Sequence, residues 1–123
     1  MSKFIKKQFR IDTFDAYWQL FVAPKISEIP DKRYRQFLIE SEVSDHWKGC
    51  YFTQEDDETG TCYLCIWLHN LDDMGTIAHE AMHLTFDLMK RKGIKYCDES
   101  EEVYTYVLGQ IVNQIVSIKP QGN

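Results

Sequence analysis

The chain has 123 residues and a formal net charge of −5, with 44% hydrophobic and 27% charged residues. These values are typical of one soluble globular domain spanning residues 1–123, and no stretch approaches the ~20 apolar residues that cross a membrane. The negative charge argues against sequence-independent binding of nucleic acid, which requires Lys and Arg to neutralise phosphates. We therefore expect no nucleic-acid partner and no membrane association.

The N-terminal segment "MSKFIKKQFRI" carries lysines without a following apolar run, so it does not have the pattern of a secretory signal. We expect a cytoplasmic location, where cysteines are reduced thiols. Cys62 and Cys65 stand three residues apart in a strand-like run, so their side chains should point to opposite faces. This spacing argues against a structural zinc site built on the pair.

The first half of the chain contains two patterns that indicate helices. Residues 13–26, "TFDAYWQLFVAPKI", have apolar side chains spaced as on one helical face, which predicts a helix ending near Pro24. Residues 30–43, "PDKRYRQFLIESEV", predict a second short helix that begins at Pro30 and Asp31.

Two β-rich runs follow, "HWKGCYFTQ" at 46–54 and "TCYLCIWLH" at 61–69. The acidic, glycine-containing segment "EDDETG" separates them. Aromatic and β-branched residues on either side of a turn-forming loop predict an antiparallel hairpin or small sheet. The acidic loop lacks the ligand spacing of a calcium site, so we interpret it as a solvated turn.

Two further helices complete the pattern and predict an α+β domain. Residues 70–93 form the first, with Asp72 or Asp73 as its N-cap and Gly93 as its stop signal. The second runs from about residue 98 to 118 on the periodicity of its apolar residues, and a flexible tail is expected at 119–123.

The segment "TIAHEAMHLTF", residues 76–86, contains two histidines four positions apart. A helix places such residues side by side, so His79 and His83 could both reach one zinc ion at about 2.0–2.1 Å. Glu80 follows the first histidine and could accept a proton from a metal-bound water as a general base. The alternative is a pair of surface histidines on an ordinary amphipathic helix.

A catalytic zinc normally has three protein ligands, so a carboxylate is sought in "CDESEEVYTYVLG". If Asp98 is the N-cap, Glu101 occupies the capping-box position and has a structural role. Glu102 shares a helical face with Tyr106 and Gly109, and Gly109 would allow another helix to approach. We therefore predict Glu102 as the third ligand, with Glu101 as the alternative.

A hydroxyl near this carboxylate could assist the reaction. Tyr106 lies one turn beyond Glu102 and could donate a hydrogen bond to the ligand or to a reacting oxyanion, and Tyr104 is the alternative donor. Amphipathicity alone would not select Glu102, because it lies nearly opposite the apolar face that Val103, Val107 and Ile111 define.

The motif "HEAMH" matches the signature of HExxH zinc metallopeptidases, and "SEEVYTYVLG" is similar to the glutamate-bearing helix of the gluzincin group. The combination particularly resembles small phage and prophage metallopeptidases. The resemblance covers residues 64–118 and implies a zincin-like domain in which His79, His83 and Glu102 hold one zinc ion. Val103 replaces the small residue that usually follows the ligand glutamate.

The resemblance implies a zinc-dependent peptidase that acts on a peptide or protein substrate, in the bacterial host cytoplasm if the chain is phage-encoded. By the same analogy, "CYLCIWLH" would be the strand that holds the substrate. The alternative is a metal-containing binding or regulatory module without hydrolytic activity.

Overall fold

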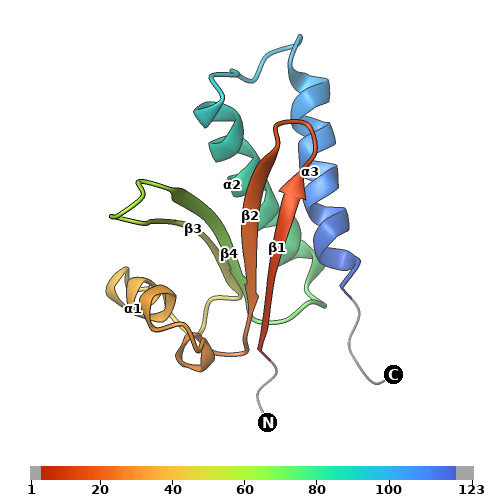
Figure 1. Ribbon diagram of the computed structural model, residues 1–123. Coiled ribbons are helices and arrows are strands. Elements are labelled where there is room, and N and C mark those ends of the chain that lie inside the picture. The colour runs from red at the N-terminus through yellow and green to blue at the C-terminus, as the bar shows by residue number, and fades with distance from the viewer. Residues whose placement is uncertain (1–3, 119–123) are drawn as a thin grey trace.

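The computed structural model describes residues 4–118 and confirms the α+β class. A four-stranded sheet with the order β1-β2-β4-β3 is combined with three α-helices in this part of the chain (Figure 1). The elements are β1 Ile5–Ile11, β2 Ala16–Val22, the short 3-10 helix η1 Ile26–Glu28, α1 Lys32–Glu40, β3 Gly49–Glu55, β4 Cys62–Leu68, α2 Met74–Arg91 and α3 Glu101–Val116. The tail predicted at 119–123 lies outside the described residues.

The helix predicted over residues 13–26 is wrong, because Ala16–Val22 forms strand β2. This strand pairs antiparallel with β1 and parallel with β4, so it lies inside the sheet. Trp18 and Leu20 are buried in one core and Phe21 in the other. A strand covered on both faces has a nearly continuous apolar run, and such a run also satisfies helical spacing.

The two faces of the sheet have separate cores (Figure 1). Helices α2 and α3 cover one face, where Leu84 and Ile111 are buried against strand residues. Helix α1 covers the other face through Tyr34 and Leu38. A buried core therefore holds α2, the helix with the histidine pair, against the strands.

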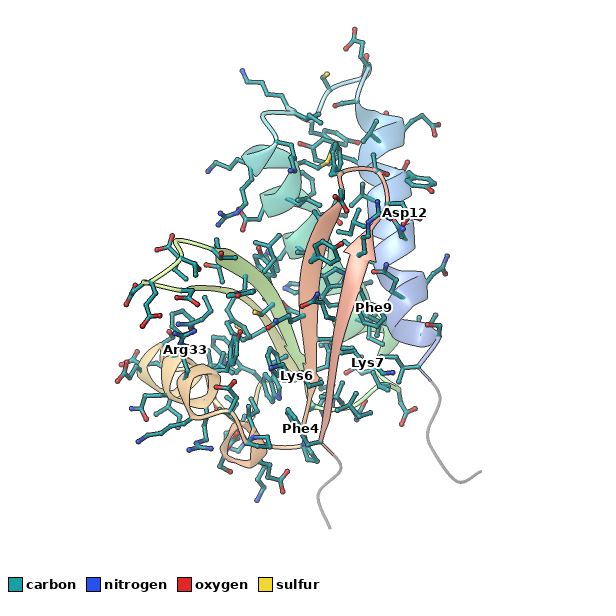
Figure 2. The ribbon with its side chains drawn as sticks, in the orientation of Figure 1. Phe4, Lys6, Lys7, Phe9, Asp12 and Arg33 are labelled. Atoms are coloured by element: carbon teal, nitrogen blue, oxygen red, sulfur yellow. The ribbon has the colours of Figure 1, made fainter. Side chains whose placement is uncertain are left out.

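Strand β1 contributes to the face that α1 covers. The ammonium group of Lys6, a residue labelled in Figure 2, lies 5.6 Å from the ring centroid of Phe21 and 5.5 Å from that of Tyr34. These are cation–π distances. The lysine therefore joins the N-terminal strand to aromatic residues of β2 and α1.

The predicted hairpin is confirmed, since β3 and β4 pair antiparallel from Gly49↔Leu68 to Glu55↔Cys62. The Asp56 carboxylate accepts the backbone N–H groups of Glu58 and Thr59, which confirms the acidic segment as a turn. Strand β4 lies between β2 and β3, so the expectation that it holds a substrate as an exposed strand is wrong. The edge strands are β1 and β3, and β3 is the one that contacts α2.

The two cysteines of β4 face opposite sides of the sheet, as their spacing predicts. Cys62 packs against the core beneath α2 and α3, and Cys65 is buried in the core beneath α1. Their thiols therefore do not converge on one ion.

The N-caps of α1 and α2 are residues that the sequence predicts as helix starts. The side chain of Asp31 accepts the N–H groups of Arg33 and Tyr34, and that of Asp73 accepts the N–H of Thr76. The hydrogen bond from Thr76 lowers the pKa of the Asp73 carboxyl group. Gly93 has φ +75° just after α2, as expected for a residue that ends a helix. No helix within residues 4–118 is long and apolar enough to cross a membrane.

The start of α3 differs from the prediction. Ser100 is the N-cap, and the helix begins at Glu101. The hydroxyl of Ser100 accepts the N–H of Cys97 and donates to the carbonyl oxygen of Lys95, which shapes the turn before the helix. Glu101 is thus the first helical residue, and the capping-box position assigned to it is wrong.

Candidate metal centre

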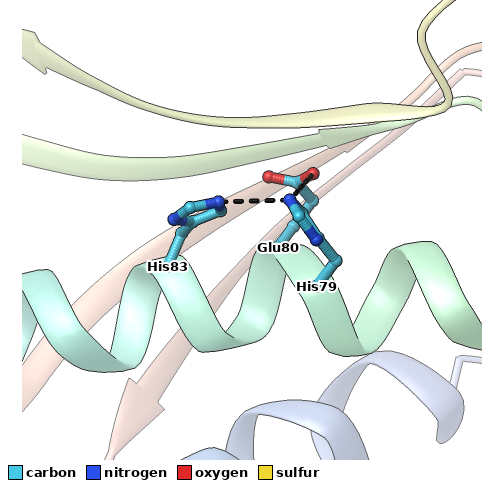
Figure 3. A group of neighbouring side chains, drawn as sticks. All are labelled: His79, Glu80 and His83. Atoms are coloured by element: carbon cyan, nitrogen blue, oxygen red, sulfur yellow. Dashed lines mark hydrogen bonds and ion pairs between the residues drawn. The ribbon is translucent and has the colours of Figure 1, made fainter.

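Helix α2 places its two histidines on an exposed face and buries the opposite face. Ile77, Ala81, Leu84 and Leu88 are all buried on the side that faces the core. Both imidazole rings project toward the same side of α2, next to β3 and β4 (Figure 3). The amphipathic pattern of this helix therefore leaves the histidine pair accessible.

The Nε2 atoms of His79 and His83 lie 3.2 Å apart (Figure 3). Two nitrogens that each lie about 2.0–2.1 Å from one tetrahedral zinc ion are about 3.3–3.4 Å from each other. The spacing therefore fits two ligands of one ion. The ligand atoms of His79, Glu80 and His83 all lie within 4.8 Å of one another, and this is the one group of its kind found in residues 4–118.

Glu80 is 7% exposed, and its carboxylate bridges the helix and the edge strand. The backbone N–H of Tyr51, in β3, donates to Oε1 of Glu80 over 2.8 Å. The second oxygen, Oε2, lies 3.9 Å from Nε2 of His79. One oxygen is therefore occupied by the strand, and the other faces the histidine pair.

A glycine allows β3 to approach α2 closely enough for this contact. A Cβ atom on Gly49 would lie 2.9 Å from Cγ2 of Thr76, in the first turns of α2, and 2.9 Å from the carbonyl oxygen of Trp67. Both distances are shorter than real Cβ contacts. This requirement has no local signal, since Gly49 has the pattern of an ordinary strand residue.

The histidine pair opens onto a cavity of about 610 Å³ between α2 and the start of β3. Trp47, which is 50% exposed, forms part of its wall. The complete lining is Trp47, Lys48, Gly49, Cys50, Tyr51, Gly75, Thr76, His79, Glu80 and His83. Trp18 and Trp67, by contrast, are core residues.

The side chain of Tyr51 makes a second connection from β3 to α2. Its hydroxyl donates to Oδ2 of Asp87 over 2.5 Å, and the same oxygen lies 3.2 Å from Nε of Arg91. Burial raises the pKa of the Tyr51 phenol, and the hydrogen bond to Asp87 raises it further. Tyr51 therefore stays protonated at neutral pH and holds the edge strand against the helix on the C-terminal side of His83.

The thiol of Cys50 lines the cavity but does not belong to the convergent group. Burial raises its pKa to about 11, with a further contribution from the negative charge of Glu80. A thiol binds zinc as a thiolate. Without a bound metal, the Cys50 thiol is thus protonated at neutral pH.

The structure does not bring Glu102 to the histidine pair. Its side chain is exposed, and it is absent from the convergent group of residues 4–118. Glu102 lies nine positions from the buried Ile111, which is about 180° around a helix. Glu102 is therefore on the side of α3 opposite its buried face, away from the core.

The other predicted residues of this helical face are likewise exposed. Tyr106 is 60% exposed, and nothing lies within 4 Å of a Cβ atom built on Gly109, so no second helix approaches there. Tyr104 is buried, and its hydroxyl donates to the carbonyl oxygen of Ile94. Neither tyrosine reaches the cavity that the histidines line.

Comparisons with protein-family models, curated proteins and solved structures give no match for this chain. The metal-centre hypothesis consequently depends on the geometry of His79, Glu80 and His83.

Proposed function

We propose that this chain is a zinc-dependent peptidase whose metal site is centred on His79 and His83. The observation that carries the proposal is the 3.2 Å separation of their Nε2 atoms beside a carboxylate that is already fixed. A hydrogen bond between the two rings gives the same separation, so the fixed carboxylate of Glu80 beside the pair is what favours a shared metal ion. The pair also faces a cavity large enough to admit part of a peptide.

The residues divide the chemistry between them. His79 and His83 would hold the ion through Nε2. When bound, zinc supplies a Lewis acid and lowers the pKa of a coordinated water toward neutrality. Glu80 uses Oε1 to accept the Tyr51 N–H, which leaves Oε2 on the histidine side to take a proton from the attacking water. The same oxygen can then pass the proton to the leaving amine.

Strand β3 is the strand along which an extended substrate would bind. It forms the edge of the sheet next to the histidines, whereas β4 is paired on both sides. A sheet edge offers backbone hydrogen bonds to an added peptide strand, except here at the N–H of Tyr51, which Glu80 accepts. We therefore assign to β3 the role that the sequence resemblance suggested for β4.

The test is digestion of a broad peptide library by the zinc-loaded protein and by its Glu80→Gln variant. The glutamine can still accept the Tyr51 N–H but cannot take a proton, so it should retain zinc and lose at least 100-fold in cleavage rate. Glu58→Gln in the exposed hairpin turn is the control and should cleave normally. Equal cleavage by Glu80→Gln and the wild type would rule out the proposed role of Glu80.

The second candidate is a metal-containing binding module without hydrolysis. It is favoured by the exposed position of Glu102, which leaves two histidines without the carboxylate ligand of a catalytic zinc site. This candidate predicts bound zinc but no cleavage of the library by the wild type.

Two single substitutions, measured side by side, test whether α3 supplies a ligand. If a carboxylate of this helix coordinates the ion, Glu102→Ala or Glu101→Ala should weaken zinc binding at least 10-fold. The arrangement of α2 and α3 predicts that both variants bind zinc as the wild type does. Loss of zinc in either variant would show that α3 takes a different position when the metal is bound.

A further inference from the structure

A second cavity, of about 500 Å³, lies at the C-terminal end of α2. We refer to it as the α2-end pocket. Its lining residues are Phe86, Asp87, Lys90, Gly93, Ile94, Lys95, Tyr96 and Tyr104. None of them belongs to the cavity at the histidine pair, so the pocket is a separate feature of the surface.

Three aromatic rings line the α2-end pocket. Phe86 and Tyr96 are 43% and 56% exposed, whereas Tyr104 is buried beneath them. The ring centroids of Tyr96 and Tyr104 are 5.0 Å apart, and those of Phe86 and Tyr96 are 6.0 Å apart. These are the distances at which aromatic rings attract one another, so a further ring could pack against the exposed faces.

The charged side chains of the pocket that have no ion-pair partner within residues 4–118 are lysines. Within residues 4–118, neither Lys90 nor Lys95 takes part in an ion pair. The one acidic lining residue, Asp87, is engaged by Arg91 and by the hydroxyl of Tyr51. The two ammonium groups are therefore left to meet an anionic ligand.

The partial negative charge at the C-terminal end of α2 should repel an anionic ligand only weakly. The last carbonyl groups of the helix accept backbone N–H groups that follow it: Lys92 donates to Leu88 and Met89, Gly93 to Lys90, and Ile94 to Met89. The partial negative charge of the helix terminus is therefore largely satisfied within the chain.

The pocket lies on the same stripe of α2 as the histidine pair. Phe86 and Lys90 follow His83 by three and seven residues, which is about 5 Å and about 10 Å along the helix axis. An extended peptide advances about 3.3 Å per residue. A peptide held at the histidines would reach the pocket with a side chain two or three residues away.

We propose that the α2-end pocket binds an aromatic side chain next to a carboxylate, as a specificity subsite of the peptide substrate. The ring packs on Phe86 and Tyr96, and the carboxylate meets Lys90 and Lys95. The carboxylate can be the free C-terminus of a peptide or an adjacent acidic side chain. This inference rests on the proposed peptidase function for its substrate, but the pocket can be tested without hydrolysis.

The test measures binding of small probes to the intact chain by amide chemical shifts of Ile94, Lys95 and Tyr96. The probes are acetyl-phenylalanine, acetyl-phenylalanine amide, acetyl-alanine and the capped dipeptide acetyl-Phe-Glu-amide. We expect saturable binding of acetyl-phenylalanine, at least fivefold weaker binding of its amide, and no binding of acetyl-alanine. Binding of acetyl-Phe-Glu-amide would show that an acidic side chain suffices, and its failure would identify the free C-terminus.

Substitutions separate the two parts of the pocket. Phe86→Ala should weaken acetyl-phenylalanine binding at least 10-fold, and Lys95→Gln at least threefold. Lys7→Gln, on strand β1, is the charge control and should have no effect. Lys95 is in a loop, so its result does not depend on the folding of Phe86→Ala.

Two results would overturn the inference. One is equal affinity for acetyl-phenylalanine and acetyl-alanine, and the other is unchanged affinity in both Phe86→Ala and Lys95→Gln. The library digest separates this failure from that of the proposed function. Probe binding without any cleavage would refute the peptidase alone, whereas cleavage with no preference for aromatic residues and no probe binding would refute the pocket alone.

Discussion

The backbone N–H of Tyr51 donates to Oε1 of Glu80 over 2.8 Å, so the glutamate of the histidine motif ties α2 to the edge strand β3. Glu80 consequently has a structural role that does not depend on any reaction. The two oxygens have different roles: Oε1 accepts the N–H of Tyr51, and Oε2 faces His79, where proton transfer is proposed. Substitutions can distinguish them.

We expect Glu80→Ala to lower the free energy of unfolding by about 1–3 kcal/mol, because it leaves the partly buried N–H of Tyr51 without its partner. Glu80→Gln retains an acceptor oxygen and should lose less than half of that amount. Urea denaturation of the two variants checks this. If they are equally destabilised, the charge of Glu80 rather than the hydrogen bond holds β3.

Gly49→Ala should separate β3 from α2. The added methyl group would lie 2.9 Å from both Thr76 and the backbone of Trp67, so the strand must shift. We expect a loss of about 1–3 kcal/mol in unfolding free energy, as for other overpacked sites, and slower peptide cleavage because Glu80 loses its anchor. Wild-type stability and cleavage rate in this variant would contradict the close approach.

Gly109→Ala is the matched control and should have the opposite effect. Nothing lies within 4 Å of its added Cβ atom, and the residue is inside α3. Replacing a helical glycine with alanine typically stabilises by about 0.5–1 kcal/mol. Destabilisation by Gly109→Ala in thermal unfolding would indicate that another surface covers this face of α3.

The thiols should differ in reactivity. Burial raises the pKa of Cys50 to about 11 and that of Cys65 to about 12, so both are protonated at pH 8. Because the thiolate is the nucleophile, iodoacetamide should alkylate the exposed Cys97 first at this pH. Labelling of Cys50 should increase as the pH rises toward 11, which mass spectrometry can follow.

Rapid alkylation of Cys50 at pH 8, at the rate of Cys97, would show that the start of β3 leaves α2 in solution. Cys65 serves as the internal control, because its position in the core beneath α1 does not depend on the contact between β3 and α2.

The sequence predicts the elements with local signals and fails where tertiary packing decides. Asp31 and Asp73 cap their helices as expected, and the acidic turn joins β3 to β4. Strand β2 was predicted as a helix because burial on both faces gives an apolar run that fits either period. No local signal shows that β4 has β2 as its second neighbour.

In the candidate site too, the sequence predicts the local contacts and misses those that depend on tertiary packing. His79 and His83 meet because four residues bring side chains together on any helix. Contacts across the fold were not predicted: Tyr51 with Glu80, Tyr51 with Asp87, and the close approach at Gly49. The choice of Glu102 depended on how α3 is covered, which periodicity cannot specify.

The most direct test of the metal site is zinc stoichiometry and affinity, measured on the purified wild type beside His79→Ala and His83→Ala. His46→Ala, in the loop before β3, is the matched control. We predict one zinc ion per chain in the wild type and the control, with at least 100-fold weaker binding in each of the other two variants. Substoichiometric zinc in the wild type, or full zinc in both His79→Ala and His83→Ala, would contradict the account.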